Sequence, residues 1–228
     1  MMVPKADSKL TLVIGNKNYS SWSLRPWLFL KKFSLPFNEK RIALFTATSD
    51  EELAVYNSNY KVPVLIDKEQ IVWDSLSIIE YLSDNYLSGG GWPADSSARA
   101  FTRSMSAEMH SSFEALRSEL PMNCRKKFSG ISLSVAAERD VERVKALWQQ
   151  CHHQYGKKGP WLAGEFSAVD AMFIPVVLRF EGYGIETNGY VKDYLQTVLE
   201  DEWVQSWIDA GIDESEIIEA DEVESIQN

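Results

Sequence analysis

The chain has 228 residues, of which 45% are hydrophobic and 25% charged, a composition typical of a soluble globular protein with one large or two modest domains. Its formal net charge is −10, but seven acidic residues and no basic one lie in 213–228, so the rest of the chain has 26 acidic residues against 23 basic ones. We therefore expect a nearly neutral body that binds no nucleic acid, and an acidic tail at 212–228 that is solvated and mobile.

Two cysteines, Cys124 and Cys151, form neither a disulfide framework nor a zinc-binding pattern, so we expect no metal site. Free cysteines suit a reducing compartment. The apolar run at 10–14 is too short for a leader or a membrane span. The sequence thus predicts a cytoplasmic protein that does not insert into a membrane.

The first part of the chain alternates between strand and helix patterns. Strands are predicted at 10–14, 37–44, 64–66 and 70–73, and helices at 20–32, from 49, where Ser49 and Glu52 have capping-box spacing, and at 75–86. The order β-α-β-α-β-β-α predicts a small mixed sheet with helices on both faces, at 9–87.

Three glycines and Pro93 then interrupt every periodic pattern and indicate a linker. Beyond it, only helical spacing is found, and we expect an all-helical domain at 95–211. Long helices are predicted at 97–120 and 134–155, and two short ones precede Gly211, which is expected to close the last. A buried central helix is predicted from 168 to 180, with Ser167 and Asp170 at capping-box spacing.

The first candidate site is Ser20-Ser21-Trp22-Ser23, at the start of the first predicted helix. Unpaired amides and the helix dipole stabilise an anion at such a position, and a serine hydroxyl there can donate to it. The alternative is that the serines only cap the helix. No cysteine pair is present at this position, which argues against dithiol chemistry.

The second candidate site combines Val62-Pro63, at the entry to a strand, with Asp74-Ser75, at the start of a helix. A cis peptide bond before Pro63 would leave the main chain of Val62 free to pair with an extended ligand. Asp74 and Ser75 would offer a carboxylate, a hydroxyl and amides. Either the two segments hold a small peptide, or they are a plain hairpin and a helix cap.

In this order and spacing, the motifs resemble the two halves of cytosolic glutathione S-transferases, a thioredoxin-like α/β domain followed by a helical bundle. The segment 166–171 is similar to the capping box of their core helix. Ser20-Ser21-Trp22-Ser23 is similar to the Ser-Ser-X-Ser of the zeta class, which suggests a zeta-like or related bacterial serine-type class. The residues that follow this motif differ from those of the zeta class, so the resemblance does not imply the isomerase activity of that class.

The resemblance implies that glutathione is the co-substrate. Val62 and Pro63 would hold its cysteinyl part, and Asp74 and Ser75 its γ-glutamyl end. Asp74 is shorter than the Glu or Gln usual in the family. Lys61 would either meet the glycyl carboxylate or face solvent.

The resemblance assigns Ser20 as the thiol-activating residue, with Ser21 and Ser23 as alternatives. Candidates for a second-substrate pocket are Met109, His110, Phe113 and Arg117, with 122–123 just beyond; for Met109 and Phe113, core packing is the favoured interpretation.

The expected function is a glutathione-dependent transferase acting on a small electrophile, with isomerisation or peroxide reduction as variants and detoxification as the setting. The alternative is a non-catalytic glutathione-binding protein of the same fold, and a redox protein is a weaker third hypothesis. Such proteins are usually homodimers that bury the long helix of the second domain, and the apolar face at 101–116 is compatible with that.

Overall fold

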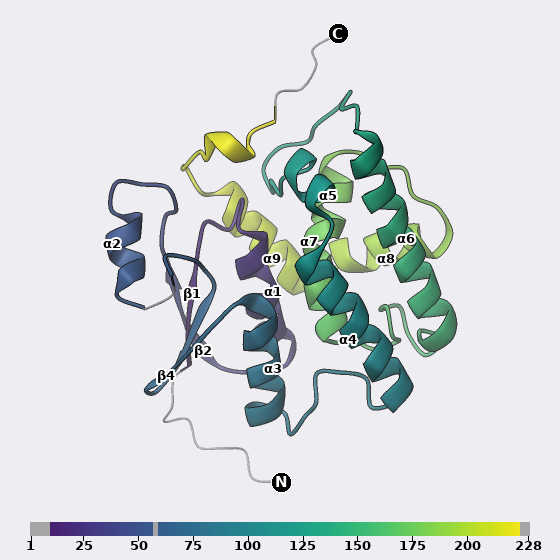
Figure 1. Ribbon diagram of the computed structural model, residues 1–228, viewed down its shortest axis with the longest axis horizontal. Coiled ribbons are helices and arrows are strands. Elements are labelled where there is room, and N and C mark those ends of the chain that lie inside the picture. Colours follow the sequence, from purple (N-terminus) through teal and green to yellow (C-terminus); the bar gives the residue numbers. More distant parts are fainter. Residues whose placement is uncertain (1–9, 57–58, 224–228) are drawn as a thin grey trace.

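The computed structural model describes residues 10–56 and 59–223, and its arrangement is shown in Figure 1. The start of the predicted first domain at residue 9 and the last part of the acidic tail, 224–228, lie outside the described residues. The first half is a sheet with helices and the second half is helical, which confirms the fold class predicted from the sequence.

The sheet has four strands in the order β2-β1-β3-β4. Its strands are β1 (Leu10–Ile14), β2 (Phe37–Arg41), β3 (Val64–Asp67) and β4 (Gln70–Trp73). β1 pairs in parallel with β2 and antiparallel with β3, and β3 pairs antiparallel with β4. The central strands β1 and β3 are the most buried, as their apolar runs predict.

Helices cover both faces of the sheet. Side chains alternate along β1, so apolar side chains of this strand point to each face and pack against the helices there. Leu12 and Ile14 join the core shared with α1 (Ser21–Lys32) and α3 (Ser75–Tyr86). Val13 points to the other face, where it packs with Leu53 of α2 (Ser49–Ala54).

Two local predictions in this half are wrong. β2 ends at Arg41 rather than at residue 44, because β1 ends at Ile14 and offers no partner further along. The helix α2 has Thr48 rather than Ser49 as its N-cap. The Ser49 hydroxyl instead donates to the carbonyl of Thr46 at 3.0 Å, so the predicted capping box does not form.

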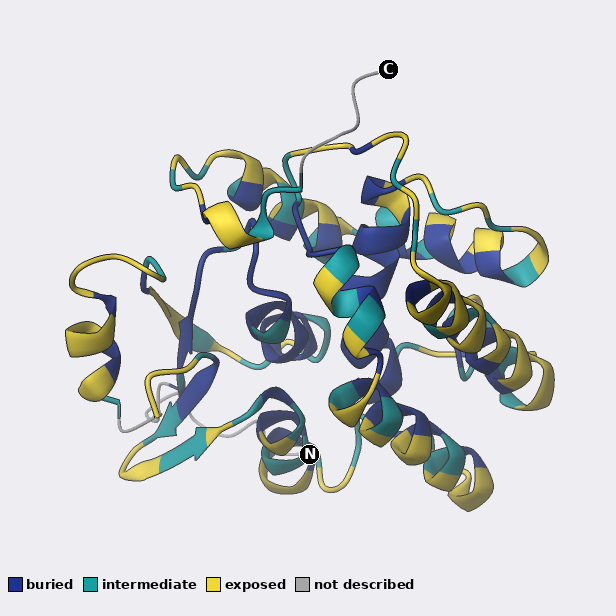
Figure 2. Ribbon diagram, turned by 45° about the horizontal axis from the view of Figure 1, so that its top comes forward, coloured by how far each residue is buried: buried dark blue, intermediate teal, exposed yellow. Residues whose placement is uncertain are grey.

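The second half is built around α7 (Ala168–Gly182), which is buried along almost its whole length (Figure 2). The other helices are α4 (Ser96–Ser111), α5 (Glu114–Glu119), α6 (Val135–Tyr155), α8 (Gly189–Leu199), α9 (Glu202–Ile212) and the 3₁₀ helix η1 (Glu219–Asp221). The capping box of Ser167 and Asp170 is present. Gly211 lies inside α9 instead of closing it. Among the described residues, no helix has both the length and the apolar character needed to cross a membrane.

The single helix predicted at 97–120 is two helices. Ser112 is extended and Phe113 has a φ of 62°, in the left-handed region, so the chain turns between α4 and α5. Met105 and Met109 are buried within the chain, and α4 packs against α7. Much of the apolar face at 101–116, which is compatible with a dimer, is therefore used inside the chain.

The prediction of a solvated tail is wrong for its described part, 213–223. Glu214 accepts hydrogen bonds from the main-chain N–H of Lys17 (2.8 Å) and of Asn18 (3.1 Å). Glu222 accepts one from the Tyr19 hydroxyl at 2.5 Å. In Figure 1 this segment (yellow) lies between α2 and α5. Acidic composition predicts a solvated run, but the side chains of Glu214 and Glu222 bind the loop that leads into α1.

Candidate active site

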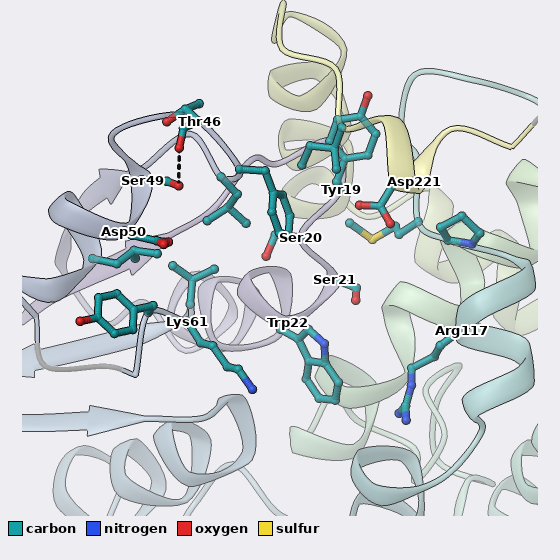
Figure 3. Close-up of a pocket in the computed structure, with 18 of the residues that line it drawn as sticks. Tyr19, Ser20, Ser21, Trp22, Thr46, Ser49, Asp50, Lys61, Arg117 and Asp221 are labelled. Carbon is teal, nitrogen blue, oxygen red and sulfur yellow. Dashed lines mark hydrogen bonds between the residues drawn. The ribbon is translucent and has the colours of Figure 1, made fainter.

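A cavity of about 700 Å³ lies at the N-terminal end of α1, between the two halves of the chain (Figure 3). Tyr19, Ser20, Ser21 and Trp22 form its floor. The α/β half adds 44–46, 49–50, Leu53 and 60–62 on one side, and the helical half adds Arg117, Pro121, Met122, Arg179, Ile218 and Asp221 on the other. The cavity therefore needs both halves and the C-terminal segment.

A second cavity, of about 510 Å³, adjoins the first and shares Trp22, Lys61 and Val62 with it. The rest of its lining includes Pro63, Trp73, Asp74, Ser75 and His110. The two candidate sites found in the sequence thus open into one continuous region of the surface.

The three serines of the first candidate site have different surroundings. Ser20 is the N-cap of α1, and its hydroxyl donates to Ser23 Oγ at 2.7 Å. Ser23 is buried away from the cavity, and its oxygen accepts the N–H of Gly15 at 3.1 Å. Ser20 and Ser21 line the cavity, whereas Ser23 ties the start of α1 to the end of β1.

The N-terminus of α1 is suited to an anion. The helix has no acidic residue in its first turn, so nothing within it offsets the positive end of the helix dipole. Ser21 accepts a hydrogen bond from the Arg179 guanidinium at 3.2 Å. This contact polarises the hydroxyl and leaves its proton free to be donated into the cavity.

The Val62–Pro63 peptide bond is cis, as the sequence suggested. β3 begins only at Val64, and no hydrogen bond between described residues uses the main chain of Val62. Ser75 is 1% exposed and lines the second cavity, and its hydroxyl has no hydrogen-bond partner among the described residues. A buried hydroxyl without a partner is costly, so it indicates a ligand group at this position.

Asp74 is the N-cap of α3, and its Oδ1 accepts the N–H groups of Leu76 (2.9 Å) and Ser77 (3.3 Å). Its Oδ2 lies 2.6 Å from Nε2 of His110, a residue of α4. His110, which we expected in the second-substrate pocket, lines the cavity of Asp74 and Ser75. The structure thus brings a side chain of the helical half to that cavity.

Met109 and Phe113 are only 1% and 4% exposed and belong to the hydrophobic core. Neither lines the two cavities, so their place in a second-substrate pocket is corrected and the core interpretation holds. Arg117 and Met122 do line the larger cavity.

Sequence reasoning missed Arg179, which lies on α7 and lines the larger cavity. The signal was an arginine inside an otherwise apolar run. Burial, together with the nearby positive charge of Arg117, lowers the pKa of Arg179 to about 10, so its guanidinium is charged at neutral pH.

Comparisons with known proteins agree with this geometry. Residues 19–85 match the family model described as "Glutathione S-transferase, N-terminal domain". A structure of a glutathione transferase homolog from Burkholderia GL BGR1 with bound glutathione superposes with a TM-score of 0.68, covering 91% of this chain and all of that one, at 19% identity.

The chain has the glutathione transferase fold. This fold agrees with the resemblance seen in the sequence, and residues 19–85 match the model of the family's N-terminal domain.

Two curated proteins are similar in sequence. A probable maleylacetoacetate isomerase of Caenorhabditis elegans is 25% identical over 171 residues, which are 75% of this chain and 78% of that protein. A dichloromethane dehalogenase of Methylorubrum extorquens is 29% identical over 66 residues, which span only 28% of this chain and 23% of that protein. Within the transferase fold, the larger cavity lies where the matched N-terminal domain faces the helices.

Proposed function

We propose that the protein is a glutathione transferase that lowers the pKa of the glutathione thiol at the N-terminus of α1 and directs the thiolate at an electrophile in the larger cavity. One observation carries the proposal: residues along the adjoining cavities have polar groups without hydrogen-bond partners among the described residues. The Ser75 hydroxyl and the main chain of Val62 have no partner among the described residues, and both residues line the adjoining cavities that lead to Ser20 and Ser21.

These groups suit an extended tripeptide. The main chain of Val62 would pair with the cysteinyl residue of glutathione. The Ser75 hydroxyl, with a main-chain N–H at the start of α3, would hold the γ-glutamyl carboxylate. Asp74 would receive the γ-glutamyl amine while it keeps its contact with His110. Lys61, which lines both cavities, would meet the glycyl carboxylate.

The chemistry that this arrangement supports is electrostatic. Ser21 would donate to the sulfur, Ser20 would do so once its hydroxyl turns away from Ser23, and the positive end of α1 would favour the negative charge. A decrease in the thiol pKa from about 8.5 to about 6.5 corresponds to about 2.7 kcal/mol, which a few charge-assisted hydrogen bonds supply. The thiolate then forms the C–S bond, and the leaving group departs with its electron pair.

The protein's own thiols do not support a redox function. Burial raises the pKa of Cys124 and of Cys151 to about 12, so neither is a thiolate at neutral pH. Both are free cysteines, which supports the further proposal that the protein works in the cytoplasm. The homodimer implied by the resemblance stays a prediction.

Calorimetric titration with glutathione tests the proposal. Replacing Ser75 by Ala removes the hydroxyl, and we expect the dissociation constant to rise about tenfold, or about 1.4 kcal/mol. Ser77→Ala is the matched control, because Ser77 lies on the same helix, is exposed and does not line the cavity; its dissociation constant should equal that of the unchanged protein.

Failure of the unchanged protein to bind glutathione would contradict the proposal. A panel of electrophiles then separates the two functions of this fold. A transferase accelerates conjugation with at least one of them, whereas a non-catalytic glutathione-binding protein accelerates none.

A further inference from the structure

Three arginines gather at the helical side of the larger cavity. Arg179 of α7 and Arg117 of α5 line it, and Arg25 of α1 lies beneath Trp22, with its guanidinium carbon 4.0 Å from the centre of the indole ring. The guanidinium carbon of Arg117 is 5.5 Å from the same ring. Figure 3 shows Arg117 reaching from the helical half toward Trp22, with Ser21 nearby.

None of the three takes part in an ion pair with a described residue. Arg179 donates to the carbonyl of Leu120 and to Ser21, and Arg117 to the carbonyl of Met109. Each of these acceptors is neutral. The charges are therefore held by hydrogen bonds but are not compensated by a carboxylate in contact.

Arg25 is a buried arginine without a carboxylate partner among the described residues. It is 1% exposed, its Nε donates to the carbonyl of Met172 at 3.2 Å, and its Nη1 has no partner. Burial, followed by the charges of Arg179 and Arg117, lowers its pKa to about 9. Uncompensated buried charges are rare in proteins because their desolvation is expensive.

Two carboxylates line the same cavity, Asp50 on the α/β side and Asp221 of η1; Asp221 influences Arg179 electrostatically, but at more than ion-pair distance. It comes from the C-terminal segment and not from the helical core. Asp140 and Glu114 also act on Arg117 through their charges, but no carboxylate of a described residue forms an ion pair with Arg25, Arg117 or Arg179.

We infer that Arg117 and Arg179 form a subsite for a carboxylate group on the electrophile, so that the favoured substrates are anionic electrophiles. The inference rests on the proposed function, which places glutathione along Val62 and Ser75. In that pose both carboxylates of glutathione meet other groups, so an anion bound by the arginines would belong to the second substrate. The subsite holds the carboxylate and orients the reacting carbon, and no bond to the carboxylate changes.

Binding of two S-conjugates tests this inference without requiring turnover. S-(4-carboxybenzyl)glutathione and S-(4-carbamoylbenzyl)glutathione have nearly the same shape and differ in one charge. We expect the carboxylate conjugate to bind the unchanged protein about tenfold more tightly, and this ratio to fall as ionic strength is raised. Glutathione alone, titrated in parallel, reports on the rest of the site.

Arg117→Gln should bring the ratio close to one and leave the affinity for glutathione unchanged, and Arg117→Lys should keep part of the preference. Arg139→Gln is the matched control, because Arg139 is an exposed arginine of α6 outside both cavities. It removes the same charge and should keep the full ratio.

Equal affinity of the unchanged protein for the two conjugates would overturn the inference and leave the proposed function standing. The inference also fails if Arg117→Gln and Arg139→Gln keep the same ratio. If neither glutathione nor either conjugate binds, the proposed function fails and the inference fails with it. Should Arg117→Gln prove unfolded by circular dichroism, Arg179→Lys and the ratio in the unchanged protein still decide.

Discussion

Within one turn of α1, three serines have three different surroundings. Ser20 and Ser21 face the cavity, while Ser23 is buried and accepts the N–H of Gly15. The sequence could not separate them, because residues so close to a helix start all have cap character and their direction depends on how β1 enters the helix.

Ser23→Ala should therefore reduce stability and spare the chemistry. The buried N–H of Gly15 loses its acceptor, and we expect the free energy of unfolding to fall by about 1–3 kcal/mol. For a chain of this length that is a decrease in Tm of about 2–12 °C in a thermal melt. The pKa of the thiol of bound glutathione should not rise. A stable variant with a raised thiol pKa would instead assign the activating role to Ser23.

The proposed glutathione-binding residues were easier to predict from the sequence than the arginines of the larger cavity. Val62-Pro63 and Asp74-Ser75 each carry a local signal, a proline at a strand entry and an Asp-Ser pair before an apolar helix. Arg117 and Arg179 come from different helices, and no local pattern shows that their guanidinium groups meet. Their convergence is a property of the packing.

At the scale of elements, the strand and helix order was predicted well because apolar periodicity decides it. The prediction failed where a single backbone angle decides where a helix ends. The helical spacing continues through 111–113, but Phe113 adopts a left-handed conformation that ends one helix and begins the next. That turn brings Arg117 to the cavity.

The C-terminal segment was misjudged for a different reason. A run of acidic residues has the composition of a solvated tail, and only the fold provides the amides and cations that bind it. Glu214 binds two main-chain N–H groups of the loop before α1, and Glu216 pairs with Arg41 at 2.7 Å.

Glu214→Gln should loosen this loop, because an amide offers one acceptor oxygen where the carboxylate offers two. We expect the free energy of unfolding to fall by about 1–2 kcal/mol, and the main-chain amides of Lys17 and Asn18 to exchange faster with deuterium. Glu219→Gln, at an exposed position of the same segment, should change neither. Unchanged exchange in Glu214→Gln would show that the segment does not hold the loop.

The same contacts predict a pH dependence. The hydrogen bond from Arg41 lowers the pKa of Glu216 below its ordinary value of 4.5. For Glu222, burial acts the other way, but hydrogen bonds from Lys126 and Tyr19 outweigh it and lower its pKa. Both groups therefore stabilise the folded state above pH 4.5, and this contribution is lost as the pH falls below that value toward their folded pKa values.

At the scale of the whole molecule, the active cavity lies where the two halves meet, so contacts between them set its geometry. The indole N–H of Trp207 donates to the carbonyl of Lys17 at 2.9 Å, and Lys32 pairs with Asp201 at 2.5 Å. Arg25 reaches the carbonyl of Met172. The helix α1 and the loop before it are thus held by α7 and α9 as well as by the sheet, which keeps Ser20 and Ser21 at the cavity.

The most direct test of the central claim is the pKa of the glutathione thiol when bound, followed by the ultraviolet absorbance of the thiolate during a pH titration. In the unchanged protein we expect a value of about 6.5–7.5, below the value of about 8.5 for an unperturbed thiol. Ser20→Ala or Ser21→Ala should raise it toward that value without abolishing binding. A bound thiol that ionises like free glutathione in the unchanged protein would contradict the account.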